Sequence, residues 1–303
     1  MICGYYFIKV FYFGDQYHGS AHQPDQNTVE DELFKALQKK GYIPKGQYKQ
    51  SKVFHAAGRT DKKVHSRAMV FGFFNFRRKF YPIEVNRSLP DDIIIWASCL
   101  IHNREELIKK GVAVGEELPA ISLEILKSLL LPRFNALQRH YRYIYYDANK
   151  ELDISRMKLA AEKLRGTHDF TNLCKVEPDR KTERTLDVID IHRKDDFIIF
   201  DFIALSFLWH QIRKTVYVLL KIGMKDWSEK LIEDLLNPIR QKISSKVGLA
   251  PAKGLILWDI IYPDNILFNI CSKSLSIIKR DLNTHIYMLQ IRTKIAKSIR
   301  DSF

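Results

Sequence analysis

The order of strand-like and helix-like segments constrains the fold of this sequence more than any other feature. Runs rich in β-branched and aromatic residues predict strands, and apolar residues at helical spacing predict helices. In the first hundred residues these patterns give a strand, a helix, a strand, a short helix and a strand, at 5–13, 29–40, 69–76, 83–89 and 93–97. Asn27, three residues before Glu30, is expected to cap the first helix, and Gly41 to end it.

The same order returns in the second part of the chain. The predicted elements are a strand, a helix, a strand pair joined by a charged turn, two helices and a strand, at 141–146, 153–165, 186–191 with 197–205, 208–222, 228–236 and 255–262. Two α+β halves of similar order, with predominantly antiparallel strands, predict duplicated ferredoxin-like (RRM-like) units.

Two segments fit neither half, so four parts are predicted. They are an N-terminal α+β half, an insertion or linker with helical stretches at 105–110 and 121–131, a C-terminal α+β half and a basic amphipathic helical tail, at 1–101, 102–131, 132–265 and 266–303. One face of the tail is apolar and contains Ile277, Ile278, Leu282, Ile286 and Leu289. This face indicates a docked C-terminal helix or an oligomer contact, although a helix on a membrane surface would look similar.

Positive charge indicates the kind of partner. The chain has 49 Lys and Arg residues against 35 Asp and Glu, which gives a formal net charge of +14. Such an excess favours a polyanion, either nucleic acid or an anionic membrane surface, over a merely solvated basic surface. No apolar run approaches the roughly 18 to 20 residues that span a bilayer, so no membrane-spanning segment is predicted.

Cysteine and histidine spacing argues against a metal site and against a disulfide framework. The four cysteines lie far apart and include no Cys-x-x-Cys pair, which favours a reducing compartment. His18 and His22 are four residues apart, but Gly19 lies between them and no third ligand is near. We therefore predict no bound metal.

The run Gly58-Arg59-Thr60-Asp61 is the main candidate for chemistry. Gly58 permits a tight turn, and Arg59, Lys62 and Lys63 place positive charge around the carboxylate of Asp61. Nearby positive charge favours the ionised carboxylate that a nucleophile or base requires, and it also attracts phosphate. An aspartate in a loop can instead bond to nearby amides in an Asx-turn, so these residues alone leave both roles open.

Five stretches of the chain match, in order, the motifs of one enzyme family. They are Gly14–Gly19, Gly58–His65, Arg133–Tyr143, Phe207–Arg213 and Ala250–Leu255. The second of them resembles the Gly-Arg-Thr-Asp-x-Gly-Val-His signature of the TruA family of tRNA pseudouridine synthases. Together the matches cover residues 5–263. The resemblance implies a catalytic cleft between two ferredoxin-like halves, in a member of the archaeal and eukaryotic type that acts on the anticodon arm.

The resemblance also implies an isomerase that converts uridine in tRNA to pseudouridine and needs no cofactor. Asp61 would be the catalytic carboxylate, either adding covalently to the nucleoside or removing a ribose proton to give a glycal. Arg213 would pair with Asp61 and keep it ionised, and Tyr141 would pack on the target base and assist proton transfer. Arg59 would fill the space that the extruded base leaves, and Leu255 would pack against that base.

Two of these residues have plainer alternatives that the residues themselves leave open. An aromatic residue in a strand, such as Tyr141, is usually part of a core. An arginine on an apolar helix, such as Arg213, can simply extend its guanidinium group to the surface.

Further implications of the resemblance concern the tRNA. The segment His168–Asn172 resembles that of members acting at positions 38–40 of the anticodon arm, with 38 and 39 preferred. Basic residues near this segment and behind Asp61 would contact the tRNA backbone, namely Lys62, Lys63, Lys175 and Arg180. The family also implies a homodimer with tRNA as its partner and no membrane association. Its location would be the cytoplasm, or the nucleus for a eukaryotic chain.

The sequence departs from the family pattern in three places. Lys63 stands where the family usually has Gly, so the loop needs a different backbone path if that glycine has a positive φ. Ser66 and Arg67 replace small or apolar residues, and the insertion at 102–131 is longer than the usual link. None of these changes removes a residue to which the family gives a catalytic role.

A non-catalytic RNA-binding module of two RRM-like halves is the main alternative, because it would share the basic charge and the antiparallel sheet. Such modules present aromatic residues in a Lys/Arg-Gly-Phe/Tyr run, which this sequence lacks. A basic structural or assembly protein is a second alternative. It would leave the combination of Asp61, Tyr141 and Arg213 unexplained.

Overall fold

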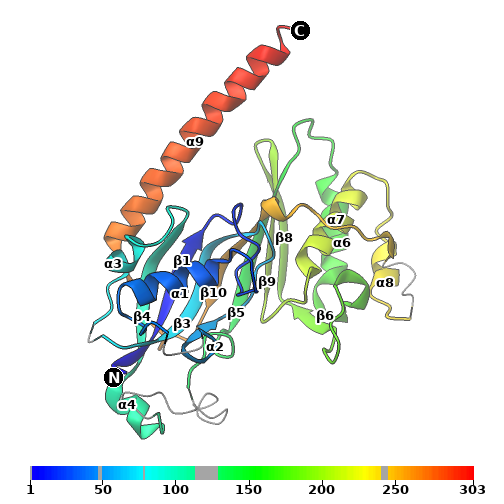
Figure 1. Ribbon diagram of the computed structural model, residues 1–303. Helices are drawn as coiled ribbons and strands as arrows, with labels where there is room; N and C mark the ends of the chain where they lie inside the picture. The colour runs from blue at the N-terminus through cyan, green and yellow to red at the C-terminus, as the bar shows by residue number, and fades with distance from the viewer. Residues whose placement is uncertain (1, 47–49, 78, 113–128, 240–244) are drawn as a thin grey trace.

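A single nine-stranded sheet organises the computed structural model, which describes residues 2–46, 50–77, 79–112, 129–239 and 245–303 (Figure 1). Its strands are β1 (Gly4–Tyr12), β2 (Phe54–Ala56), β3 (His65–Asn75), β4 (Ile93–Asn103), β5 (Gln138–Tyr146), β8 (Val188–Lys194), β9 (Phe197–Ala204), β10 (Leu255–Ile261) and β11 (Asn269–Ile270). The order across the sheet is β11-β4-β1-β3-β10-β5-β9-β8, with β2 paired to β3 beside this path. The pairings are antiparallel except that of β3 with β10, so the predicted predominantly antiparallel arrangement of strands is confirmed.

Helices pack against the sheet in both parts of the chain. Their bounds are α1 (Val29–Lys39), α2 (Gln50–Val53), α3 (Pro82–Asn86), α4 (Arg104–Lys109), α6 (Ile154–Leu164), α7 (Gln211–Gly223), α8 (Leu231–Leu235) and α9 (Ser272–Arg300). A separate two-stranded sheet pairs β6 (Gly166–Asp169) with β7 (Glu183–Leu186). Helix α6 lies against α7 and β8, and α3 lies against α1 and β4.

The first helix shows how closely spacing predicts burial, and where it misses a cap. Its buried residues are the four at helical spacing, Val29, Leu33, Ala36 and Leu37. The predicted cap at Asn27 is wrong by one residue. Thr28 caps the helix because its side chain accepts a hydrogen bond from the backbone N–H of Asp31, an interaction that satisfies one free amide of the first turn.

The two parts of the sheet meet at β10. One edge of this strand lies parallel to the start of β3, where Ile256 pairs with His65 and Leu257 with Ser66. Its other edge pairs antiparallel with β5, beginning with Leu255 opposite Tyr143. Because His65 follows the Asp61 loop directly, this joint fixes that loop against the C-terminal part of the sheet.

Cationic and aromatic side chains alternate across this joint on one face of the sheet. The guanidinium carbon of Arg142 lies 4.2 Å from the ring centroid of Trp258. That of Arg67 lies 5.4 Å from Trp258 and 5.6 Å from Trp96. Arg142 is in turn held by Asp201, which accepts two hydrogen bonds at 2.9 and 3.0 Å. Arg67 therefore packs across the joint, because a cation is attracted electrostatically to the face of an aromatic ring.

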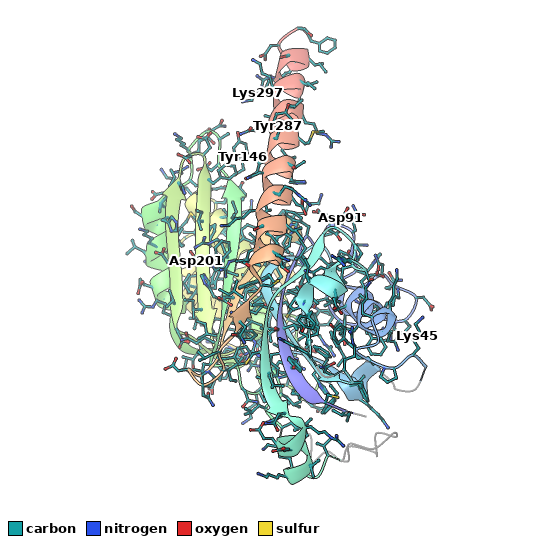
Figure 2. All side chains as sticks on the ribbon, turned by 90° about the vertical axis from the view of Figure 1, so that its left-hand side faces the viewer. Lys45, Asp91, Tyr146, Asp201, Tyr287 and Lys297 are labelled. Carbon is teal, nitrogen blue, oxygen red and sulfur yellow. The ribbon has the colours of Figure 1, made fainter. Side chains whose placement is uncertain are left out.

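The C-terminal tail forms the long helix α9, which leaves the body of the protein (Figures 1 and 2). Its first half packs, from buried Ser274 and Ile278, 9% exposed beside β4, to His285, whose ring centroid lies 5.2 Å from that of Phe13. Farther along, Ile286 and Leu289 are about half exposed, so the expected docking holds for the first half of the helix alone. No helix among the described residues is long and apolar enough to cross a membrane. Most of the stretch predicted as a helix at 121–131 lies outside the described residues.

His55 on β2 gives the fold a specific dependence on pH. Burial lowers the pKa of His55 from 6.5 to about 4, so the fold disfavours its charged form. The unfolded chain binds this proton first, and stability is therefore lost as pH falls from 6.5 towards 4. We expect the free energy of unfolding to drop by about 3 kcal/mol over this window from His55 alone. Urea unfolding of wild type and His55→Gln at several pH values measures the difference.

The His55→Gln variant should lack this part of the pH dependence while keeping a polar group near Tyr5, whose hydroxyl lies 2.9 Å from His55 Nδ1. A His192→Gln variant, altered at a side chain with 43% exposure, serves as the control and should keep the wild-type slope. Equal slopes for wild type and His55→Gln would contradict the assignment.

Candidate active site

The loop that carries Asp61 is fixed by contacts to Thr60 and by close backbone approach. The Thr60 side chain bonds to the hydroxyl of buried Tyr12 at 2.8 Å, and its backbone N–H donates to Ser20 Oγ at 2.8 Å. Gly19 has a φ of 114°, and a Cβ atom there would lie 2.8 Å from the Thr60 carbonyl oxygen. The Gly14–Gly19 motif therefore supports the Asp61 loop, because only glycine permits this approach without strain.

Lys63 adopts the left-handed conformation, with a φ of 66°. The turn around it closes through a hydrogen bond from the N–H of Val64 to the carbonyl of Asp61 at 3.1 Å. The loop thus takes a conformation that favours glycine, and the lysine occupies it at an energetic cost. The departure from the family residue leaves the loop closed and Asp61 in the cleft.

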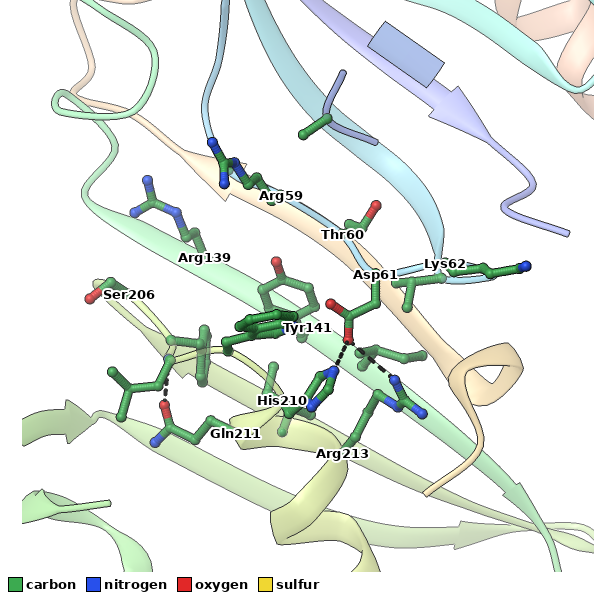
Figure 3. Close-up of a pocket in the computed structure, with 18 of the residues that line it drawn as sticks. Arg59, Thr60, Asp61, Lys62, Arg139, Tyr141, Ser206, His210, Gln211 and Arg213 are labelled. Carbon is green, nitrogen blue, oxygen red and sulfur yellow. Dashed lines mark hydrogen bonds and ion pairs between the residues drawn. The ribbon is translucent and has the colours of Figure 1, made fainter. Parts of the chain in front are cut away.

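Two side chains from the start of α7 approach the same oxygen of Asp61 (Figure 3). Arg213 Nη1 donates to Asp61 Oδ2 at 3.2 Å, and His210 Nε2 lies 3.5 Å from that atom. All three side chains are partly buried, with 15 to 27% exposure. The pKa of His210 is lowered, chiefly by burial. The negative charge of Asp61 opposes this effect, and the positive charge of Arg213 adds to it. The imidazole is therefore neutral at pH 7, and Arg213 is the charged partner.

The turn before α7 aims these two side chains. His210 has a φ of 65°, and Gln211 beside it accepts a hydrogen bond from the N–H of Leu208 at 2.8 Å. Arg213 Nε donates to the carbonyl of Ala250 at 2.8 Å, and the Ala250 N–H donates back to the Arg213 carbonyl at 3.1 Å. Ala250 thereby fixes both the side chain and the backbone of Arg213. The helix begins at Gln211 rather than at the predicted Leu208.

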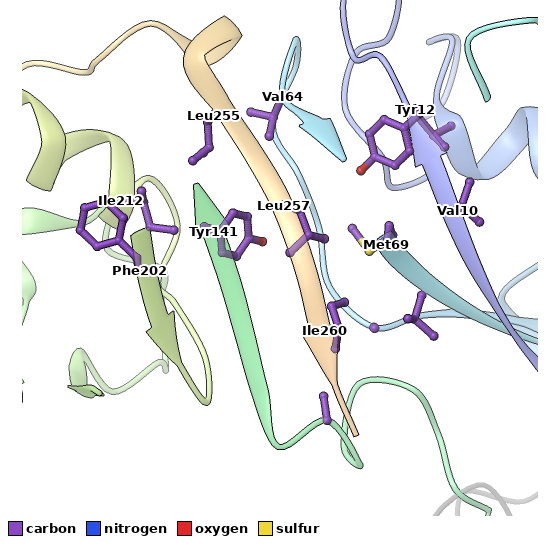
Figure 4. Packing of buried hydrophobic residues seen from close by; sticks show 14 of the residues in the cluster. Val10, Tyr12, Val64, Met69, Tyr141, Phe202, Ile212, Leu255, Leu257 and Ile260 are labelled. Atoms are coloured by element: carbon purple, nitrogen blue, oxygen red, sulfur yellow. The ribbon is translucent and has the colours of Figure 1, made fainter. Parts of the chain in front are cut away.

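Tyr141 and Leu255 lie near each other in the buried packing (Figure 4) and form an apolar wall of the cleft that Asp61 also lines. Both are buried, at 8% and 6% exposure, and both line the cleft. The Tyr141 ring meets Phe207 edge to face, with centroids 5.3 Å apart. Burial raises the pKa of the Tyr141 hydroxyl to about 12, so the phenol is protonated at neutral pH. The sequence left open whether Tyr141 is a core residue or part of the site. In the structure its ring belongs to the core and also faces the cleft.

The cleft has a volume of about 680 Å³ and is lined from both parts of the sheet. Asp61, Tyr141, Arg213, Leu255 and Arg59 all line it, which brings together every residue to which the resemblance gives a role in catalysis or base binding. Of the four basic residues expected to contact the tRNA backbone, Lys62 and Arg180 line the cleft, and Lys63 and Lys175 are exposed outside its lining.

Some residues of the cleft were not singled out from the sequence. His210 stands in the matched Phe207–Arg213 stretch, so its position was visible but its approach to Asp61 was not. Arg139 lies inside the matched Arg133–Tyr143 stretch but was given no role; it is buried and donates to the carbonyl oxygens of Ala57, Arg133 and Leu205. A buried charge satisfied by backbone carbonyls leaves no periodic signal in a sequence.

One group of residues could supply three metal ligands, and it lies apart from the cleft lining. Within the described ranges, Asp190, His192 and Asp201 place one ligand atom each within 4.8 Å of one another. Asp201 is already engaged by Arg142 and by His140, at 2.5 Å from His140 Nε2. Because these partners occupy the carboxylate, the group is better explained as part of the ion pairs on the sheet.

Comparison with known proteins places the chain among relatives. A family model described as tRNA pseudouridine synthase matches residues 160–263. The tRNA pseudouridine synthase A of Archaeoglobus fulgidus is 34% identical, over 85% of this chain and 83% of the relative. The chain belongs to the tRNA pseudouridine synthase family. The enzyme of the same name from Methanobrevibacter smithii is 32% identical over 97% of both chains, and that from Borrelia turicatae is 30% identical over 84% of this chain and 97% of its own. The resemblance to the TruA family is confirmed, and as a pseudouridine synthase the protein is an isomerase.

Replacing Lys63 with glycine should stabilise the synthase. Glycine takes a positive φ without strain, whereas other residues lose roughly 1 to 2 kcal/mol there. After the extra entropy that glycine loses on folding, we expect Lys63→Gly to raise the free energy of unfolding by about 0.5 to 1 kcal/mol in urea titrations.

Lys225 provides the matched control, because it is also a lysine with a positive φ, 64°, and lies outside the cleft lining. Lys225→Gly should give a similar gain, whereas Lys63→Ala should not, since alanine keeps the strain. A loss of stability in Lys63→Gly would show that the lysine side chain contributes more than its backbone costs.

Proposed function

We propose that the protein isomerises uridine to pseudouridine at positions 38–40 of the tRNA anticodon arm, chiefly 38 and 39, with Asp61 as the catalytic carboxylate. The observation that carries the proposal is the Asp61–Arg213 ion pair at 3.2 Å, in a cleft also lined by Tyr141 and Leu255. Family membership supports the reaction and the tRNA substrate. The His168–Asn172 segment supports the target positions by resemblance.

The reaction exchanges one bond to the ribose for another. The bond between uracil N1 and ribose C1′ breaks, the uracil turns, and uracil C5 bonds to C1′. C5 then loses a proton and N1 gains one, so the atoms balance without an oxidant or reductant. Asp61 acts either by adding to the nucleoside or by taking a ribose proton to give the glycal. Both routes require an ionised carboxylate with one oxygen unblocked. The contacts of Asp61 support this, because both Arg213 and His210 approach Oδ2.

Tyr141 and Leu255 enclose the extruded base in this proposal. Base-modifying enzymes must draw their target out of its stack, and the flipped base needs an apolar pocket. A phenol with a raised pKa is protonated at pH 7, so Tyr141 relays a proton by giving up its own as it takes one up. Arg59, exposed at the cleft, fills the space that the base leaves in the tRNA. Lys62, Lys63, Lys175 and Arg180 then contact the tRNA backbone.

The two ferredoxin-like halves are also part of the proposal, with boundaries at 1–101 and 132–265. The strand orders β4-β1-β3-β2 and β10-β5-β9-β8 support them, because both place the first strand of the unit between its last and its third. We further propose a homodimer in the cytoplasm, or in the nucleus of a eukaryote. The half-exposed apolar side chains of α9, including Tyr287 at 61% exposure, provide a surface for a second copy (Figure 2).

Replacing Asp61 should abolish the chemistry and spare binding. We expect Asp61→Asn to lower the single-turnover rate of pseudouridine formation by on the order of 10⁴ or more, because a neutral amide can serve neither route. The assay is conversion of uridine in an unmodified anticodon-arm tRNA, with the sites mapped. The tRNA affinity of the variant should stay within a few-fold of wild type. Product formation by Asp61→Asn at the wild-type rate would contradict the catalytic role of Asp61, and wild-type binding without product would favour the RNA-binding module.

Arg213→Lys should separate charge from geometry. Lysine keeps the positive charge but cannot donate to the Ala250 carbonyl and to Asp61 from a planar, fixed fork. We expect the single-turnover rate to fall roughly 100-fold at saturating tRNA, as misplacement of a catalytic group by about 1 Å would cause, with affinity unchanged. Lys214→Arg, on the same helix turn but outside the cleft lining, is the control and should retain the wild-type rate. A rate for Arg213→Lys equal to wild type would show that charge alone suffices.

A further inference from the structure

Arginine side chains crowd the end of the cleft away from Arg213. Arg59, Arg133, Arg139 and Arg180 all line the cleft. Figure 3 shows Arg59 and Arg139 together on the opposite side of Tyr141 from Arg213. Burial lowers the pKa of Arg133, and the positive charges of Arg180, Arg59 and Arg139 lower it further. These guanidinium groups are therefore close enough to repel one another, and such a cluster attracts an anion.

Two of the four guanidinium groups have partners that define the site. Buried Arg139 donates from Nη2 to the carbonyl oxygens of Ala57 and Arg133, at 2.8 and 2.9 Å. This bond pair ties the backbone at Arg133 to the strand end that leads into the Asp61 loop. Arg180 pairs with Glu177, which is a carboxylate at the same end of the cleft. Arg139 thus fixes the backbone of Arg133 relative to the Asp61 loop. The one negative charge of Glu177 offsets only one of the four positive charges.

The other two guanidinium groups are open to a ligand. Within the ranges that the structure describes, no hydrogen bond or ion pair engages the side chain of Arg59 or Arg133, and both are exposed to the cleft. A guanidinium group presents its donors in a planar fork that matches two phosphate oxygens. Arg133 is therefore placed to receive an anionic group of a ligand whose other end lies at Asp61.

We propose that Arg133 binds the phosphodiester of one linkage flanking the target uridine, at a subsite whose position relative to Asp61 is set by Arg139. The inference rests on the proposed function, since it is the uridine at Asp61 that brings this linkage to the cluster. A phosphate held here fixes the flipped nucleotide by its backbone, whereas Tyr141 and Leu255 enclose its base. Phosphate contacts of this kind position a nucleic acid without reading its sequence.

Binding measurements with arginine variants of the protein and with tRNA that lacks a phosphate charge test the subsite. Affinity for a full-length tRNA is measured as a function of salt for wild type, Arg133→Ala and Arg133→Lys. We expect Arg133→Ala to bind roughly tenfold more weakly and to lower the slope of log K against log salt by about 1, because one phosphate contact is lost. Arg133→Lys should restore the slope, since lysine keeps the charge, but only part of the affinity. Arg104→Ala, at an exposed arginine on α4 outside the cleft, should match wild type.

A neutral methylphosphonate placed at either linkage beside the target uridine identifies the contact. One of the two substitutions should weaken binding by wild type about as much as Arg133→Ala does, and should have no further effect on that variant. If both substitutions weaken the variant as much as wild type, or if Arg133→Ala leaves the salt slope unchanged, the subsite is wrong. The binding arm is independent of catalysis. Failure of the proposed function would appear separately, as wild type that binds tRNA and forms no pseudouridine.

Discussion

The pairing of β10 with the start of β3 is the constraint on which the site depends. It joins only two residue pairs, yet β3 begins directly after the Asp61 loop and β10 begins at Leu255. The segment entering β10 also supplies the Ala250 carbonyl that fixes Arg213. One short parallel contact therefore places the carboxylate, its charged partner and an apolar wall in one cleft, although they are separated by up to 194 residues in sequence. The opposite face of the sheet reinforces this joint, because Arg67 of β3 and Arg142 of β5 both pack on Trp258 of β10.

This arrangement explains why two departures from the family pattern leave the cleft intact. Arg67 follows Ser66 in a strand, so the two side chains point to opposite faces of the sheet. The arginine lies between Trp96 and Trp258, away from Asp61, and the Ser66 hydroxyl bonds within the strand, accepting from the Met69 N–H at 2.8 Å. Lys63 keeps the loop closed at the cost of a strained backbone. The added charge therefore lies outside the space where a base would bind.

The sequence predicted the elements better than it predicted their ends and their contacts. Periodicity located α1, α6 and α7 because their buried positions repeat, and runs of β-branched and aromatic residues located the long strands. The start of α7 was nevertheless placed three residues early. That boundary depends on the left-handed backbone of His210, a conformation that no propensity predicts for histidine. Motif order found Asp61, Tyr141, Arg213 and Leu255. It could not find the role of Arg139, whose partners are carbonyl groups that every residue has, or the exposure of α9, which depends on what packs against it.

The position of Asp61 poses an electrostatic problem that its partners resolve. A carboxylate and a phosphate 5 Å apart repel each other by about 3 kcal/mol at an effective dielectric constant near 20. In the proposed reaction, an unpaired Asp61 would thus repel the polyanion whose nucleoside it has to reach. Arg213, 15% exposed and fixed by Ala250, offsets the charge of the carboxylate. In the proposed complex, the arginine cluster at the other end of the cleft would then draw the tRNA backbone away from the carboxylate. Separation of the two charged regions would let one cleft bind an anionic substrate and still present the carboxylate that the proposed reaction requires.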